Sequence, residues 1–140
     1  MVPHGTADLI ISMEAMEALR YIEYLKPGGV IVMSERLLHP VIETSSIVAK
    51  RRDNLEYITL EQVKEKLLQV TNNIRIVDAG AMSIEAGNTR TQNIVFLGVA
   101  SQLEGYPLTT EQLVDAVKRI VPERTISENV KAFELGMSSN

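Results

Sequence analysis

The sequence contains no cysteine and no tryptophan, and only 4% of its 140 residues are aromatic. Without cysteine the chain cannot form a disulfide, use a thiol in catalysis or ligate an iron–sulfur cluster through thiolates. Its two histidines cannot make a zinc site without carboxylate ligands. The few aromatic side chains leave little surface for stacking nucleic-acid bases.

Charge and hydropathy exclude further classes of protein. The chain carries 14 Lys and Arg against 18 Asp and Glu, a net charge of −4, which is not the basic footprint of a nucleic-acid binder. Its apolar runs are far shorter than the ~20 residues that a membrane span needs. The start, MVPHGTAD, lacks the cationic and apolar regions of a signal peptide. We therefore expect a cytoplasmic globular protein with a single domain over residues 1–140.

Apolar runs predict three strands, and apolar periodicity predicts helices between and after them. The strands are expected at residues 7–12, 30–33 and 74–78, and the helices at 13–25, 60–71, 79–87, 89–103, 110–120 and 127–135. Thr59 with Gln62, and Thr109 with Gln112, predict capping boxes. Pro27-Gly28-Gly29 is expected to be the turn that stops the first helix. Ser127 should cap the last helix and Gly136 should end it, leaving 137–140 as a frayed tail.

These elements predict an α/β domain with three layers and a mainly parallel sheet. Residues 36–57 read as a long loop or excursion, with possible short strands near 41–42 and 57–58. Three strands make a thin sheet for so many helices, and the first strand begins six residues into the chain. We expect that a part of the fold preceding Asp8 is absent.

Two candidate sites follow predicted strands. Glu14 and Glu17 lie just past the first strand, where α/β sheets bind ligands, and could hold a hydroxyl or a cation. Alternatively, they offset the dipole at the start of a helix. Asp78, near Gly80, either contacts a ligand or caps the following helix.

The densest polar cluster is EAGNTRTQN, hereafter the 85–93 segment, directly before the most apolar helix. Gly87 and Asn88 suit a left-handed turn, and Thr89 can cap a helix whose N-terminus faces an anion. Arg90 and Asn93 would share a face, with the guanidinium offering a planar fork to phosphate or carboxylate. The alternative is a helix start satisfied by its own polar neighbours, with Arg90 paired to Glu85.

Other polar features carry weaker signals. The basic run at residues 50–52 is either a solvated loop or a contact for an acidic partner or a nucleotide phosphate. His4 and His39 are solitary, with no spacing that suggests a catalytic triad. The sequence contains neither G-x-G-x-x-G nor a phosphate-binding loop. No metal site is expected.

Four stretches together resemble one family. They are ADLIISMEAMEALRYIEYLKPGGVIVMSE, the 85–93 segment, the NIVFLGVAS helix and the closing VPERTISENVKAFELG. The chain resembles the gamma-type domain of the 2-oxoacid:ferredoxin oxidoreductases over nearly its whole length. The specific part is Glu-Ala-Gly-Asn-x-Arg-x-x-Asn with a tail at Asn129, Ala132, Phe133 and Gly136.

The resemblance implies coenzyme A-dependent oxidative decarboxylation of an aryl pyruvate, indolepyruvate, to acyl-coenzyme A, carbon dioxide and reduced ferredoxin. It implies that thiamine diphosphate and iron–sulfur clusters belong to a companion alpha subunit, and that this chain alone binds no cofactor. The domain is expected to pack against the thiamine-bearing part and to help form the coenzyme A or substrate side of the site. The candidate binding residues are Glu14, Glu85, Gly87, Asn88, Arg90 and Asn93.

The sequence departs from the family at its start. Family members begin with a strand, a G-x-G-G-Q-G turn and a helix, and this sequence has none of that motif. We therefore expect an N-terminally truncated subunit or fragment, inactive by itself, that self-associates as a homodimer through an uncovered sheet edge.

Two other functions remain open from the residues. The DLII strand, the helix and LKPGGVIV are similar to the middle of S-adenosylmethionine-dependent methyltransferases. Those enzymes also need an earlier Gly-rich turn, and their later strands form an antiparallel pair. A non-catalytic structural or interaction domain is the third interpretation, and it predicts that substitutions in the 85–93 segment change stability only.

Overall fold

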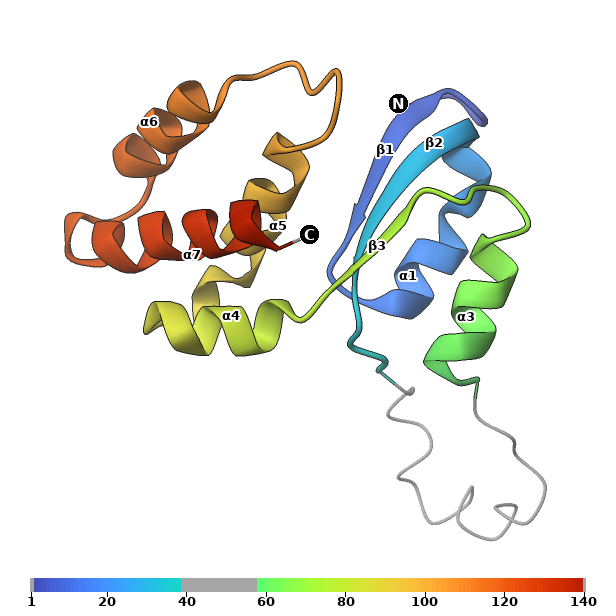
Figure 1. The fold of residues 1–140 in the computed structure, drawn as a ribbon, viewed down its shortest axis with the longest axis horizontal. Helices are drawn as coiled ribbons and strands as arrows, with labels where there is room; N and C mark the ends of the chain where they lie inside the picture. The colour runs from blue at the N-terminus through green and yellow to red at the C-terminus, as the bar shows by residue number, and fades with distance from the viewer. Residues whose placement is uncertain (1, 39–57, 140) are drawn as a thin grey trace, which may run out of the picture.

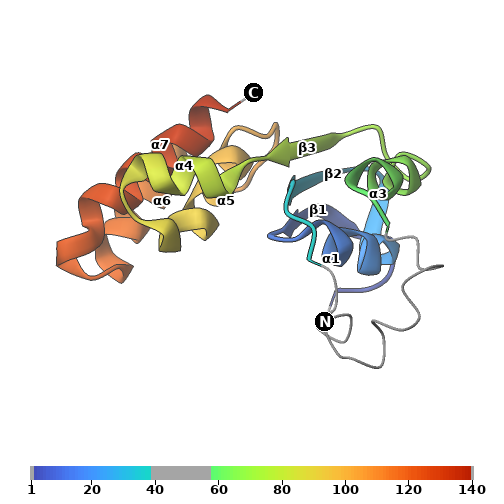
Figure 2. The same ribbon diagram turned by 90° about the horizontal axis from the view of Figure 1, so that it is seen from below.

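The computed structural model describes residues 2–38 and 58–139. Its strands β1 (Ala7–Ser12), β2 (Leu25–Ser34) and β3 (Ile74–Val77) form one parallel sheet in the order β1-β2-β3. Helices α1 (Ala15–Arg20) and α3 (Leu60–Leu67) cover one face of the sheet, and four further helices form a group beside the other (Figures 1 and 2). The predicted α/β class with a parallel sheet is confirmed.

Strand β2 is the centre of the molecule. Ile31 and Met33 belong to the core under α1 and α3, whereas Val32 belongs to the core on the opposite side. Because successive side chains of a strand point to opposite faces, one strand serves two cores. β1 lies at an edge of the sheet and leaves Ile11 42% exposed.

The prediction of a turn at Pro27-Gly28-Gly29 is wrong, because these residues lie inside β2 as an irregularity. Ala7 pairs with Leu25 and Leu9 pairs with Val30, so β2 holds three more residues than β1 between these pairs. Gly28 takes a φ of 75°, which allows the chain to bulge. Leu25 is only 3% exposed and belongs to the core that contains residues of α1 and α3. Because Leu25 is buried there, the strand begins before the two glycines.

The first helix is therefore shorter than predicted. α1 ends at Arg20, and a 3₁₀ turn, η1 (Ile22–Tyr24), leads into β2. Helix α3 likewise ends at Leu67 rather than near 71. Both capping boxes are confirmed, at Thr59 for α3 and at Thr109 for α6 (Thr110–Ile120).

The helical group consists of α4 (Ala79–Ala86), α5 (Gln92–Ser101), α6 and α7 (Ile126–Ser138). The prediction that α5 is buried is confirmed, with Val95 fully buried and Phe96 and Val99 each 1% exposed. The helix α7 begins before Ser127, which does not cap it, and continues through Gly136. A Cβ on Gly136 would lie 3.2 Å from the Gly98 Cα, so α5 and α7 cross with their backbones in contact.

Residues 39–57 lie outside the described residues. The expected strand near 41–42, the basic run at 50–52 and His39 all belong to this stretch.

Candidate functional site

Glu14 lies just past β1, and both oxygens of its carboxylate accept backbone hydrogen bonds. Oε2 accepts from the Glu17 amide at 3.0 Å and caps α1, while Oε1 accepts from the Leu38 amide at 2.9 Å. Glu17 pairs with Arg20, with 3.1 Å between Oε1 and Nη1. These contacts favour the interpretation in which Glu14 and Glu17 stabilise the start of α1.

Asp78 follows β3 and caps α4. Its Oδ1 accepts from the Ala81 amide at 2.9 Å, so the capping interpretation is confirmed. Ser34, paired with Val77 at the end of β2, uses its hydroxyl oxygen to accept from the Arg36 amide at 3.1 Å. The carboxyl ends of the strands are thus occupied by local hydrogen bonds.

The 85–93 segment forms the turn between α4 and α5. Gly87 takes a φ of 94° and ends α4, with its amide donating to the Ile84 carbonyl at 2.9 Å. The Asn88 amide donates to the Ser83 carbonyl at 3.0 Å. This pattern is a glycine-dependent helix C-cap, so the predicted left-handed turn is confirmed.

Asn88, rather than Thr89, provides the next cap. Its Oδ1 accepts from the Arg90 amide at 3.0 Å and opens a 3₁₀ turn, η4 (Thr89–Thr91). The Thr91 hydroxyl donates to the Asn88 carbonyl at 2.8 Å, and Thr91 is 1% exposed. The prediction that Thr89 caps α5 is wrong, because η4 intervenes and no side chain caps the start of α5.

Three side chains of the segment remain available. Glu85, Arg90 and Asn93 are exposed, and within residues 2–38 and 58–139 none of these side chains forms a hydrogen bond or an ion pair. The alternative in which Arg90 pairs with Glu85 is therefore not what the structure shows. The exposed Arg90 guanidinium can bind a phosphate or carboxylate oxygen, and the exposed Asn93 carboxamide can donate a further hydrogen bond.

Helix α7 holds this turn in place. The Lys131 Nζ donates to the Glu85 carbonyl at 2.6 Å, and the Asn129 Nδ2 donates to the Thr125 carbonyl at 2.7 Å within α7 and its approach. The buried Ala132 packs in the core that also contains Ala86. The 85–93 segment and the tail in α7, which form the specific part of the resemblance, thus pack on each other. Sequence analysis missed Lys131, since no local pattern joins residues 46 positions apart.

The structure does not bring Glu14 to the 85–93 segment. Glu14 begins α1, whereas α4 extends away from the sheet and carries the segment at its far end (Figures 1 and 2). In the described residues no hydrogen bond or ion pair joins them. The candidate site therefore reduces to the α4–α5 turn.

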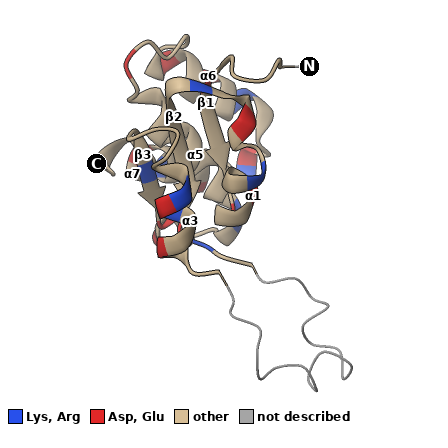
Figure 3. Cartoon of the chain, turned by 90° about the vertical axis from the view of Figure 1, so that its right-hand side faces the viewer, with Lys and Arg blue, Asp and Glu red and all other residues tan. Residues whose placement is uncertain are grey.

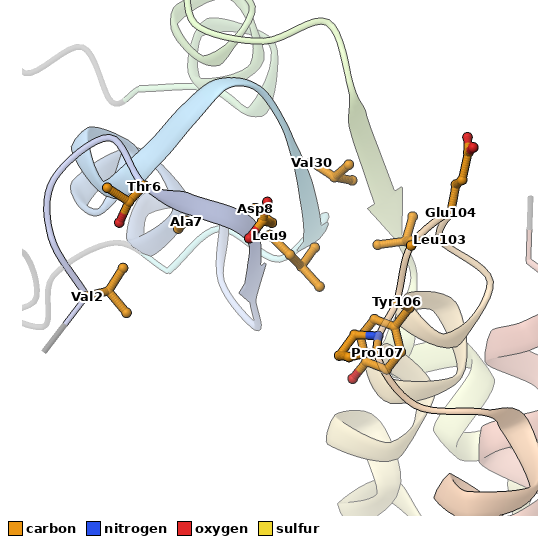
Figure 4. Close-up of a pocket in the computed structure, with 11 residues that line it drawn as sticks. Val2, Thr6, Ala7, Asp8, Leu9, Val30, Leu103, Glu104, Tyr106 and Pro107 are labelled. Carbon is orange, nitrogen blue, oxygen red and sulfur yellow. The ribbon is translucent and has the colours of Figure 1, made fainter.

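A cavity of about 510 Å³ lies elsewhere, between the start of β1 and the loop after α5 (Figure 4). Apolar side chains line it, among them Leu9, Val30 and Leu103, with Asp8 and Glu104 at its polar part. None of the residues singled out from the sequence lines this cavity. Its lining residues come from distant parts of the chain, which no sequence pattern groups together.

Charges of both signs alternate over the face that α1 and α3 present (Figure 3).

Beside the cavity, Lys26 donates a hydrogen bond to Asp8, and this bond and the charge of Lys26 lower the pKa of the Asp8 carboxyl. The His4 and Tyr24 rings contact each other at a tilt of 44°, with 4.6 Å between their centroids, and the His4 Nδ1 lies 3.6 Å from Glu23 Oε2. In the described residues no group of three or more His, Cys, Asp or Glu could hold a metal ion. None of the described helices is long and apolar enough to cross a membrane.

Together, the parallel sheet and the helices on its two sides define an α/β domain, with the α4–α5 turn braced by α7. The model of the pyruvate ferredoxin/flavodoxin oxidoreductase family matches residues 1–139. The chain belongs to this family.

The curated relatives agree with this assignment, and a solved structure shares the fold. The chain is 39% identical to the indolepyruvate oxidoreductase subunit IorB of Thermococcus kodakarensis and 37% identical to that of Pyrococcus horikoshii, over 99% of this chain and 66% of each relative. It therefore spans just under two thirds of the length of these relatives. The gamma subunit of a keto/oxoacid ferredoxin oxidoreductase from Geobacter sulfurreducens shares the fold, with a TM-score of 0.66 at 22% identity over 96% of this chain and 64% of that one.

A second solved structure shares the fold more distantly. It is a 2-oxoglutarate:ferredoxin oxidoreductase from Magnetococcus marinus with 2-oxoglutarate, coenzyme A and succinyl-coenzyme A bound, with a TM-score of 0.57 at 15% identity over 96% of this chain and 20% of that chain. The comparisons do not favour a methyltransferase, and the three described strands are all parallel.

Proposed function

We propose that this chain is the non-thiamine subunit of an indolepyruvate:ferredoxin oxidoreductase in the cytoplasm. The complex would convert an aryl pyruvate and coenzyme A to acyl-coenzyme A and carbon dioxide. In this reaction the bond between the keto carbon and the carboxylate breaks and a bond to the thiol sulfur forms. Two electrons pass to ferredoxin, and the thiol proton is released.

The single observation that carries this proposal is the 39% identity to an indolepyruvate oxidoreductase subunit across 99% of the chain. The same match covers the surface turn at residues 85–93 as well as the core, and it favours the subunit over a purely structural domain. This chain covers 66% of each of these relatives. We therefore expect activity from the complex with the companion subunit and not from this chain alone.

The chemistry must be divided between subunits. This sequence has no cysteine, so its residues do not fit an iron–sulfur cluster. Thiamine diphosphate, on the companion alpha subunit, would supply the carbanion chemistry of decarboxylation. Our chain would supply a binding surface, in which Arg90 and Asn93 hold anionic or carbonyl groups of coenzyme A at the α4–α5 turn.

The test is reconstitution. The subunit would be co-expressed with its thiamine-bearing partner, and reduction of ferredoxin would be followed with indolepyruvate, phenylpyruvate, pyruvate and 2-oxoglutarate, each with and without coenzyme A. We expect activity with the two aryl substrates that requires coenzyme A. Activity with pyruvate or 2-oxoglutarate alone would overturn the substrate assignment, and a complex that works equally well without this subunit would overturn its role.

A further inference from the structure

The end of helix α4 depends on a side chain from α7. The last carbonyls of a helix have no partner within it and must be satisfied otherwise. The amides of Gly87 and Asn88 satisfy the carbonyls of Ile84 and Ser83. The carbonyl of Glu85 is satisfied by the Lys131 Nζ at 2.6 Å.

An ammonium group suits this position. The aligned peptide dipoles of α4 leave partial negative charge at its C-terminus, which attracts a cation. One turn earlier on α7 lies Glu128, whose Cγ would be 3.7 Å from a methyl group placed on Gly87. Helix α7 therefore bonds to the end of α4 through Lys131 and places Glu128 beside the open side of Gly87.

Hydrogen bonds made by Asn88 and Thr91 link the contact between Lys131 and α4 to Arg90. The Asn88 amide is bound to Ser83 in α4, and the Asn88 carboxamide oxygen accepts from the Arg90 amide at 3.0 Å. Thr91 is bound to the Asn88 carbonyl through both its amide, at 3.0 Å, and its hydroxyl, at 2.8 Å. A displacement at the end of α4 is therefore passed on to the backbone of Arg90.

We propose that Lys131 is a positioning residue, whose ammonium on the Glu85 carbonyl sets the orientation of the turn that presents Arg90 and Asn93 to coenzyme A. This inference rests on the proposed function, since it concerns the same binding surface. Lys131 acts through the turn and does not itself bind the co-substrate.

The first test compares three variants in the assembled complex. Lys131→Met keeps the aliphatic stem and removes the donor, Lys131→Arg keeps a cationic donor, and Lys64→Met on α3 is the matched control. For Lys131→Met we expect a rise of about three- to tenfold in the KM for coenzyme A with kcat little changed, below the ~10²-fold that a 1 Å misplacement can cost. Lys131→Arg should restore most of the loss and Lys64→Met should change nothing.

An unchanged KM in Lys131→Met would overturn the inference, as would a Lys131→Arg variant no better than Lys131→Met. Hydrogen exchange on the same complexes gives a readout independent of activity. The amides of Gly87 and Asn88 should exchange faster in Lys131→Met, while those of α6 stay unchanged. Unaltered exchange at both amides would also count against Lys131.

A double-mutant cycle separates this inference from the proposed function. If Lys131 acts through Arg90, Lys131→Met should have no further effect on KM in an Arg90→Ala background. Effects that multiply would overturn the positioning role and leave the proposed function intact. If Arg90→Ala itself leaves the KM for coenzyme A unchanged, the proposed binding surface fails, and the role of Lys131 fails with it.

Discussion

Gly98 and Gly136 allow two helices of the domain to touch through their backbones. A Cβ on Gly98 would lie 3.1 Å from the Gly136 Cα and closer still to the Phe133 carbonyl oxygen. A Cβ on Gly136 would collide with the Val95 carbonyl oxygen. Gly136 therefore serves the helix crossing and does not end α7.

Replacing Gly136 by alanine should destabilise the domain by about 3 kcal/mol, because backbone atoms cannot move aside as a flexible side chain can. Gly80→Ala is the matched control, since a Cβ there meets only Asp78 Oδ1 at 3.4 Å and alanine favours a helix by about 1 kcal/mol. Urea unfolding of both variants would measure the difference. Equal stability of the two would contradict the backbone contact.

Arg90 and Asn93 are the residues whose replacement should affect function rather than folding. Both are exposed, and Arg90→Ala should raise the coenzyme A requirement about tenfold or more, since a hydrogen bond to a charged group contributes about 1.5–3 kcal/mol. Asn93→Ala should have a smaller effect in the same direction. Steady-state kinetics of the assembled complex would show this. Altered unfolding with unaltered kinetics would instead support the non-catalytic structural interpretation.

At the scale of elements, the four helices α3, α5, α6 and α7 begin in two different ways. α3 and α6 start at capping boxes, whose residues are three apart in the sequence. α5 and α7 start without a side-chain cap, each directly after a 3₁₀ turn. Local sequence signals locate the first kind of start, whereas packing locates the second.

Glu111, in the first turn of α6, should make stability depend on pH. Hydrogen bonds from its own backbone amide and then from the Thr109 hydroxyl lower the pKa of its carboxyl. A pKa that is lower in the folded state adds stability above the unfolded value, near 4, and that stability is lost as the pH falls through the folded value. Urea midpoints between pH 6 and pH 2 should therefore fall less steeply for Glu111→Gln. An identical pH profile for the variant would refute this.

At the scale of the whole molecule, the sheet has an edge that no other strand pairs with among residues 2–38 and 58–139. β1 pairs with β2 on one side only, and Ile11 in it and Met13 just beyond it are 42% and 56% exposed. Parallel sheets are usually covered on both faces, and an open edge is a template for pairing with another strand. We propose that the 140-residue chain by itself associates as a homodimer through β1.

Size-exclusion chromatography with light scattering would test this proposal. The isolated chain should elute at twice the monomer mass at micromolar concentration. Ile11→Lys should shift it to the monomer, because a charged side chain on an edge strand opposes pairing. Ile120→Lys is a suitable control, since Ile120 is 81% exposed at the end of α6, far along the chain from the edge. A strict monomer, or equal effects of both variants, would rule out the β1 interface.

Much of the candidate site was accessible from the sequence, because its parts are local. Gly87 with Asn88 signals a left-handed turn at any position in a chain, and Asp78 before a helix signals a cap. The contact of Lys131 and the apolar cavity could not be predicted from the sequence, because they join residues far apart in the chain. The error at Pro27–Gly29 has the same origin, since the burial of Leu25 against α1 and α3 outweighs the local tendency of Pro-Gly-Gly to form a turn.

The sequence by itself determined the α/β class, the three strands, the capping boxes and the turn at Gly87, since each follows from periodicity or from backbone preferences over a few residues. Only the tertiary structure decided that both carboxylate oxygens of Glu14 accept backbone hydrogen bonds. It also decided that Arg90 stays unpaired in the described residues and that Lys131 bonds to the end of α4. These outcomes depend on which side chains meet after the helices pack. Contacts of that kind are set by the close approach of α5 and α7 and by the burial of shared cores, and not by neighbouring residues in the chain.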